Sequence, residues 1–226
     1  MMRRLPVLVI LIAALVLLAA CGGGQLTAAD ILSQSADAMA GIDSVQFAIE
    51  RQGEGLSISL TQTMNVLLLG AAGGYQAPDS ATAAVRVNAA GMVAEAEMLW
   101  QGGEIFYKLP PLVTTFTPIE LTGFSISDIF NAEVGIPAIL KTLENPTLVG
   151  EEDVDGVTAY HITAAADGER ISGLVGGAVQ PGPATLDLWI AKDTMYVIRI
   201  TIMEEGENGW LVDFFGYNEP VEIPTP

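Results

Sequence analysis

Residues 92–108 read MVAEAEMLWQGGEIFYK, and the fold depends on the pattern in this stretch. From Met92 to Trp100 every second residue is apolar, and the alternation resumes at Ile105 after Gly102-Gly103. A period of two is typical of a β-strand with one buried face. The connection between the two runs is too short for a crossover helix, so we expect the strands to be antiparallel neighbours.

The same alternation recurs along most of the chain. The runs 44–50 and 56–61 flank a turn at residues 53–55, and we expect them to form a hairpin. The Gly- and Pro-rich stretch 167–183 is expected to be a loop with at most one helical turn. Further strands are predicted over residues 85–87, 147–151, 158–164, 184–191, 196–203 and 210–217.

Two segments have a helical period instead. Thr27 and Asp30 have the spacing of a capping box ahead of apolar residues at helical spacing, which predicts a first helix. Residues 125–145 are expected to form two short helices, with Ser127 capping the first and Pro137 at the start of the second. Helices and an antiparallel sheet together place the chain in the α+β class.

The beginning of the chain is typical of an export signal. Arg3 and Arg4 precede an apolar run over residues 5–20, which is shorter than the roughly 20 residues that span a bilayer. The run ends in Leu18-Ala19-Ala20-Cys21, which resembles the lipobox of bacterial lipoproteins, where a diacylglyceryl group is joined to the Cys thiol. Two alternatives remain: Cys21 is only a small residue near a cleavage site, or the apolar run stays as an anchoring helix.

The lipobox interpretation divides the chain into three parts. Residues 1–20 form the signal peptide, and residues 21–26 contain the lipidated Cys21 and a Gly-rich tether. Residues 27–226 form the exported domain. The expected location is the extracytoplasmic face of the cell membrane, with the diacylglyceryl group on Cys21 as anchor and no other cofactor.

The composition excludes several classes of function. The chain has 226 residues, half of them hydrophobic, with 9 Lys and Arg against 27 Asp and Glu and a formal charge of −18. Nucleic-acid binding needs clustered cations that neutralise phosphates, so no nucleic-acid partner is expected. One Cys and one His supply neither a disulfide nor a zinc site, so no metal is expected.

The order of the parts resembles the LppX/LprA/LprF/LprG-type lipoproteins, whose fold is similar to that of LolA and LolB. Each fragment is short, and the ordered set is more specific than any one of them. Besides the lipobox, the matching fragments are 42–47, 75–79, 104–108, 135–140 before Asn145-Pro146, 154–156, 188–190 and 217–221.

The resemblance implies a single strongly curved antiparallel sheet, a half-barrel, with helices packed on its concave face around an apolar cavity. It also implies that the cavity holds acylated lipid without catalysis. The expected partners are this lipid and a lipid-export transporter, and we expect a monomer. The chain is more acidic and richer in Ala and Gly than we expect of mycobacterial members, so its ligand class need not be theirs.

Candidate lipid contacts are the strand residues that alternate onto the apolar face and the apolar residues of the helices. Residues 125–145 interrupt two strand-rich halves, so we expect this segment to act as a lid over the cavity. The residues expected to line the cavity are Phe47, Ile49, Ile58, Leu60, Met98, Ile105 and Tyr107 on strands, and Ile136, Leu140 and Leu143 in the helical segment.

Two other functions compete with lipid carriage. A structural or sensory envelope lipoprotein of the same fold, with a solid core and a protein partner, would show the same alternation, so the pattern does not separate the two. A hydrolase is a distant third, because the chain has no Gly-x-Ser-x-Gly motif and its one histidine, His161, is expected to be a surface or hydrogen-bonded strand residue. We therefore expect no enzyme.

Overall fold

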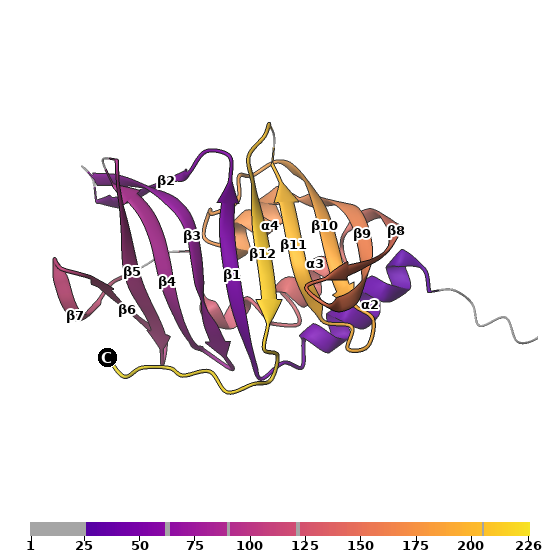
Figure 1. Cartoon of the computed structure of the whole chain (residues 1–226), viewed down its shortest axis with the longest axis horizontal. Coiled ribbons are helices and arrows are strands. Elements are labelled where there is room, and N and C mark those ends of the chain that lie inside the picture. Colours follow the sequence, from indigo (N-terminus) through magenta and orange to yellow (C-terminus); the bar gives the residue numbers. More distant parts are fainter. Residues whose placement is uncertain (1–25, 62–63, 90, 121–122, 205) are drawn as a thin grey trace, which may run out of the picture.

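The computed structural model describes residues 26–61, 64–89, 91–120, 123–204 and 206–226 (Figure 1). The predicted signal peptide and Cys21 lie outside these ranges. The helical elements are α2 (Ala28–Met39), the 3-10 helix η1 (Ile126–Asp128), α3 (Ile136–Leu140) and α4 (Gly168–Leu174). The strands are β1 (Ser44–Gln52), β2 (Leu56–Thr61), β3 (Met64–Gln76), β4 (Ser80–Ala89), β5 (Met92–Gln101), β6 (Glu104–Leu109), β7 (Val113–Pro118), β8 (Glu144–Val154), β9 (Val157–Asp167), β10 (Pro183–Ala191), β11 (Val197–Met203) and β12 (Gly209–Phe215).

The strands form one curved antiparallel sheet, which confirms the predicted fold class. Its order is β7-β6-β5-β4-β3-β1-β12-β11-β10-β9-β8, with β2 beside β3. From β3 the chain proceeds strand by strand to the β7 edge, crosses by η1 and α3 to the β8 edge, and returns strand by strand to β12. There it pairs with β1, so the first and last strands meet in the middle of the sheet.

The predicted hairpin between residues 44–50 and 56–61 is wrong. β2 pairs with the first half of β3, whereas β1 pairs with the second half of β3 and with β12. Both edges of β1 are therefore occupied by long strands, and β2 is left to pair where β3 extends beyond β1. The β1–β2 connection instead contacts the β11–β12 turn, where the Glu54 backbone N–H donates to the Asn208 side chain at 2.9 Å.

The helices differ from the prediction at two places. Ser127 lies inside η1, whose N-cap is Ser125, so Ser127 does not cap this helix. The stretch after β9 contains the seven-residue helix α4, more than the single turn expected. The carboxylate of Asp167 accepts a hydrogen bond from the Glu169 backbone N–H and so supplies a cap that a search for Ser or Thr overlooks. β7 was not predicted.

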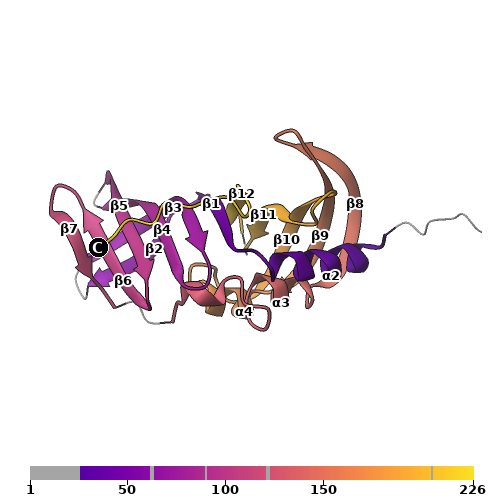
Figure 2. The same cartoon turned by 90° about the horizontal axis from the view of Figure 1, so that it is seen from below.

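The first helix is confirmed together with its cap. The Thr27 side chain accepts from the Asp30 backbone N–H, and the Asp30 carboxylate accepts from the Thr27 backbone N–H, which completes the capping box. The apolar side of α2, including Ile31 and Met39, belongs to the hydrophobic core, in which β9–β12 also take part. Figure 2 shows α2, α3 and α4 together on one side of the sheet, under the half that contains β8–β12.

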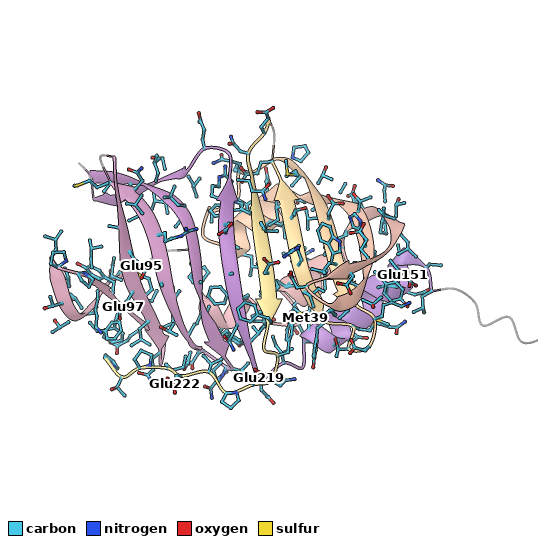
Figure 3. All side chains as sticks on the ribbon, in the orientation of Figure 1. Met39, Glu95, Glu97, Glu151, Glu219 and Glu222 are labelled. Carbon is cyan, nitrogen blue, oxygen red and sulfur yellow. The ribbon has the colours of Figure 1, made fainter. Side chains whose placement is uncertain are left out.

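The inner face of the sheet is the one that α3 and α4 cover, and the outer face is the opposite one. Figure 3 is seen from the outer side, with Glu95 and Glu97 of β5 turned toward the reader. The described helices and strands and the hydrophobic core lie within residues 26–226, so a fragment of these residues contains the fold as described.

Candidate functional site

A pocket of about 280 Å³ lies between the inner face of the sheet and the helical segments. Its volume is near the lower end of the roughly 300–1,000 Å³ that is typical of small-molecule sites. Strands β1, β3, β4, β5 and β10–β12 form one wall, and η1, α3 and α4 with their flanking residues form the other.

The strand register explains how residues far apart in the sequence reach this wall. In antiparallel neighbours, directly opposed residues point to the same face. Consecutive pairings place one residue from each of six strands in a row, and every member of the row lines the pocket. The row is Val85, Ala71, Ile49, Val212, Ile200 and Leu188.

The floor of the pocket is built from small residues of β3 and β4. Gly73 is opposite Phe47 on one side and Ala83 on the other. A Cβ at Gly73 would collide with the carbonyl oxygen of Thr82, so only glycine permits this approach of the two strands. Ala71 and Ala83 add little volume, and the space above them is part of the pocket.

The helical segment covers the pocket with aliphatic and aromatic side chains. The centroid of the Phe130 ring lies 4.9 Å from that of Tyr75 on β3 and 6.1 Å from that of Phe214 on β12. Phe130 therefore packs the helical segment against two strands that flank β1. A backbone hydrogen bond from Ile136 N–H to the Ile129 carbonyl oxygen, at 2.8 Å, holds η1 against the start of α3. The pocket therefore has a wall that is separate from the sheet and joined to it by side-chain packing.

The chemistry of the pocket is that of a hydrocarbon site. Every lining residue is Ala, Val, Ile, Leu or Phe except Tyr75 and Trp100, and none is charged. The Tyr75 hydroxyl donates to the Pro78 carbonyl oxygen, and burial, with Asp79 nearby, raises the pKa of Tyr75. The lining thus offers an apolar guest a dry surface and contains no Ser, Cys, carboxylate or imidazole side chain.

The sequence of residues 27–223 matches the model of the LppX_LprAFG lipoprotein family. The chain belongs to this family. The predicted resemblance is thereby confirmed over nearly all of the chain that the structure describes. No curated protein matches the sequence.

Solved structures agree with the family assignment. LprF from Mycobacterium bovis superposes with a TM-score of 0.70 at 17% identity, covering 88% of this chain and 96% of LprF. LppX from Mycobacterium tuberculosis superposes with a TM-score of 0.61 at 22% identity, covering 87% of this chain and 98% of LppX. At these identities the likeness shows that the fold is shared.

Four of the residues predicted to line a cavity do line the pocket of this LppX_LprAFG family member. They are Phe47 and Ile49 on β1, and Ile136 and Leu140 in α3. Leu140 is also almost completely buried in the core that α2 and α3 share, so it has a structural role as well. Contact of these residues with a lipid stays a prediction.

The other predicted strand residues lie outside the pocket. Met98, Ile105 and Tyr107 are half-buried on the inner face, where register places Met98 opposite both Ala83 and Tyr107, but they lie beyond the pocket wall on β5 and β6. Ile58 is half-buried on β2, and the side chain of Leu60 falls outside the described part of the chain. Parity predicted the face correctly, but it does not show how far the pocket extends.

Leu143 and Cys21 complete the predicted set. Leu143 lines a different, smaller hollow with Thr142 and Arg170. Cys21 lies outside the described residues, so its lipidation stays a prediction. Within the described ranges, no helix is both long and apolar enough to cross a bilayer.

Most of the pocket wall was not predicted from the sequence. Ile171, Leu174 and Val175, in and after α4, line it, although this stretch was predicted to be a loop. Leu188 and Ile200 line it from β10 and β11, and the alternation of these strands was the signal that could have placed them there. Trp100 has the same parity as Met98 and was also overlooked.

His161 is a hydrogen-bonded strand residue on the outer face, as predicted, and it is remote from the pocket. Its Nδ1 lies 2.9 Å from Glu152 Oε1, and its Nε2 lies 3.0 Å from Asp187 Oδ1. Its ring stacks on the Trp189 ring, with 4.5 Å between the ring centroids. Hydrogen bonds from the Trp189 indole and from His161 lower the pKa of Glu152. No serine nucleophile takes part in this network, and the described residues contain no His, Cys, Asp and Glu cluster able to hold a metal.

Proposed function

We propose that this protein binds the hydrocarbon part of an acylated lipid in the inner-face pocket and carries it without catalysis. The observation that supports this most directly is the composition of the pocket, whose walls come from seven strands and the helical segments and contain no charged residue. A site of this kind gains affinity from burial alone, at about 0.8 kcal/mol for each methylene group removed from water.

The proposed location is the extracytoplasmic face of the cell membrane, through an acyl anchor on Cys21. The family is one of lipoproteins, and Cys21 is the single cysteine, at the end of the apolar run. Two acyl chains are sufficient for durable anchoring without a spanning helix. The anchor is independent of the pocket, so each part of the proposal has its own test.

The test of the pocket is mass spectrometry of lipids extracted with organic solvent from purified residues 26–226. We expect an acyl lipid in a fixed ratio to protein, reduced in a variant with Ala83→Leu, which fills the floor. Ala84→Leu is the matched control, because Ala84 neighbours Ala83 and points to the outer face. Equal lipid in both variants, or no bound lipid and no uptake of added fatty acid, would favour a structural lipoprotein with a protein partner.

The test of the anchor is the distribution of full-length protein between membrane and soluble fractions. We expect Cys21→Ser to release or mislocalise the protein and to leave residues 1–20 uncleaved. Unchanged recovery of Cys21→Ser in the membrane fraction would show that something other than acylation of Cys21 holds the protein there.

A further inference from the structure

Trp100 lines the pocket and also has a buried indole N–H without a partner. Trp100 is the residue that β5 contributes to the lining, and its Nε1 atom is buried with no hydrogen-bond partner among the residues that the structure describes. The other two indoles are paired: Trp189 Nε1 donates to Glu152 at 2.8 Å, and Trp210 Nε1 donates to the Ala178 carbonyl oxygen at 2.9 Å.

An unpaired buried indole N–H calls for a physical explanation. Burial removes the donor from water, and without an acceptor in its place the folded state loses free energy. Buried tryptophan N–H groups therefore normally have a partner. The neighbours of Trp100 provide none from their side chains: Ala81 and Ile105 are opposite it on β4 and β6, and Phe124 lies edge-on at 6.0 Å.

Trp100 lies at one end of the pocket wall, which favours one orientation of an acyl chain. In the strand order, β5 is at one end of the pocket wall and β10 is at the other. The β10 end, with Leu186 and Leu188, lies in the half of the sheet that the helices cover, whereas Figure 2 shows no helix under β5–β7. A chain that enters from the β5 side would therefore place its methyl end near β10 and its polar end near Trp100.

We propose that the Trp100 indole N–H donates a hydrogen bond to the carbonyl oxygen of the bound acyl group. This rests on the proposed function and names its substrate class: fatty acids and acyl esters, which have a carbonyl, in preference to alkanes and polyprenyl chains, which have none. The carbonyl is the one polar part of an acyl chain, and Trp100 is the one unpaired donor of the described pocket wall. The rest of the lipid lies beyond Trp100, over the half-buried inner face of β5 and β6.

The test uses the indole N–H signals of residues 26–226 in ¹H–¹⁵N spectra, with methyl palmitate and heptadecane as probes of similar length. We expect methyl palmitate to move the Trp100 signal downfield, as a new hydrogen bond does, and heptadecane to leave it near its unliganded position. The signals of Trp189 and Trp210 are internal controls, because both indoles are already paired. An equal response of the Trp100 signal to both probes would overturn the inference.

Affinity gives a second readout that spectral overlap does not affect. Trp100→Phe keeps an aromatic ring and removes the N–H, so we expect binding of methyl palmitate to weaken about five-fold, equivalent to about 1 kcal/mol. Heptadecane should bind this variant as well as it binds the wild type. Equal losses for both probes would show that Trp100 only packs against the chain. If neither probe binds the wild type, the proposed function fails and this inference fails with it.

Discussion

The two halves of the sheet have the same alternating sequence pattern but very different surroundings. In the half that contains β8–β12, the inner face is covered by helices, and Ile162, Leu188 and Ile190 are fully buried. In the half that contains β2–β7, Figure 2 shows no helix under β5–β7, and the start of β5 leaves Met92 and Val93 72% and 65% exposed. The alternation therefore predicts which face of a strand is apolar, and the covering layer decides whether that face becomes core, pocket or open surface.

The sharpest test of this comparison is one substitution made in both halves. Ile162→Ala, on β9, should lower the free energy of unfolding by about 4 kcal/mol, because Ile162 is fully buried and truncation leaves a cavity. Ile105→Ala, on β6, should cost less than about 1.5 kcal/mol, because Ile105 is half-exposed and water can fill the space. Urea unfolding of both variants measures this, and equal losses would show that the halves are equally packed.

Ion pairs should show the same contrast. Arg51 on β1 and Glu204 after β11 form a 2.7 Å pair with side chains 4% and 3% exposed, whereas the Lys108–Glu97 pair is much more exposed. Glu204→Gln leaves the Arg51 charge buried without its partner and should cost about 3 kcal/mol. Glu97→Gln should cost less than about 1 kcal/mol.

The pH dependence of the Glu204 effect has a definite sign. Burial by itself would raise the pKa of Glu204, but hydrogen bonds from Arg51 and the Gln180 backbone N–H lower it below the ordinary value. The carboxylate therefore stabilises the fold above the pKa of the unfolded chain, about 4.3, and this contribution is lost as pH falls through the lower pKa of the folded state. Thermal unfolding from pH 7 to 3 should show the gap between wild type and Glu204→Gln closing below about pH 4.3. A gap that widens on acidification would contradict this.

The glycines of β3 and β8 provide a third comparison. Gly73→Ala, at the pocket floor, should cost about 2 kcal/mol, because its Cβ would collide with the Thr82 backbone and the strands must shift. Gly150→Ala, on the edge strand β8, should be close to neutral, because a Cβ there meets nothing within 4 Å. Thermal unfolding distinguishes the two, and a neutral Gly73→Ala would mean that the floor can move.

The lid interpretation predicts the smallest effect on stability. Ile136 is half-buried at the pocket wall, so Ile136→Ala should cost about 1 kcal/mol of stability while weakening the binding of a fluorescent fatty acid several-fold. The control is Val179→Ala, in the buried core and outside the pocket lining, which should lower stability without changing the affinity of the folded protein. If Ile136→Ala lowers stability and leaves affinity unchanged, α3 is core packing and the gating idea is wrong.

Local patterns predicted most of the sheet, and non-local contacts explain what they missed. The alternation around Met98 and the capping box at Thr27 report short-range chemistry, so the corresponding strand and helix were found. β2 pairs with β3 because β1 already lies between β3 and β12. The pairing of the first strand with the last cannot be read from a local sequence pattern. Likewise Phe47 and Tyr107 have the same parity, but only Phe47 lies where the helical segment closes a pocket over the sheet.

The binding of fatty acids of increasing chain length to residues 26–226 tests the proposed function most directly. If the inner-face pocket holds the chain, affinity should rise by up to about four-fold per methylene until the pocket is full. Folded Ala83→Leu should reach its plateau at a shorter chain than the wild type, whereas Ala84→Leu should match the wild type. Affinity that does not depend on chain length, or identical curves for wild type and Ala83→Leu, would contradict lipid binding in this pocket.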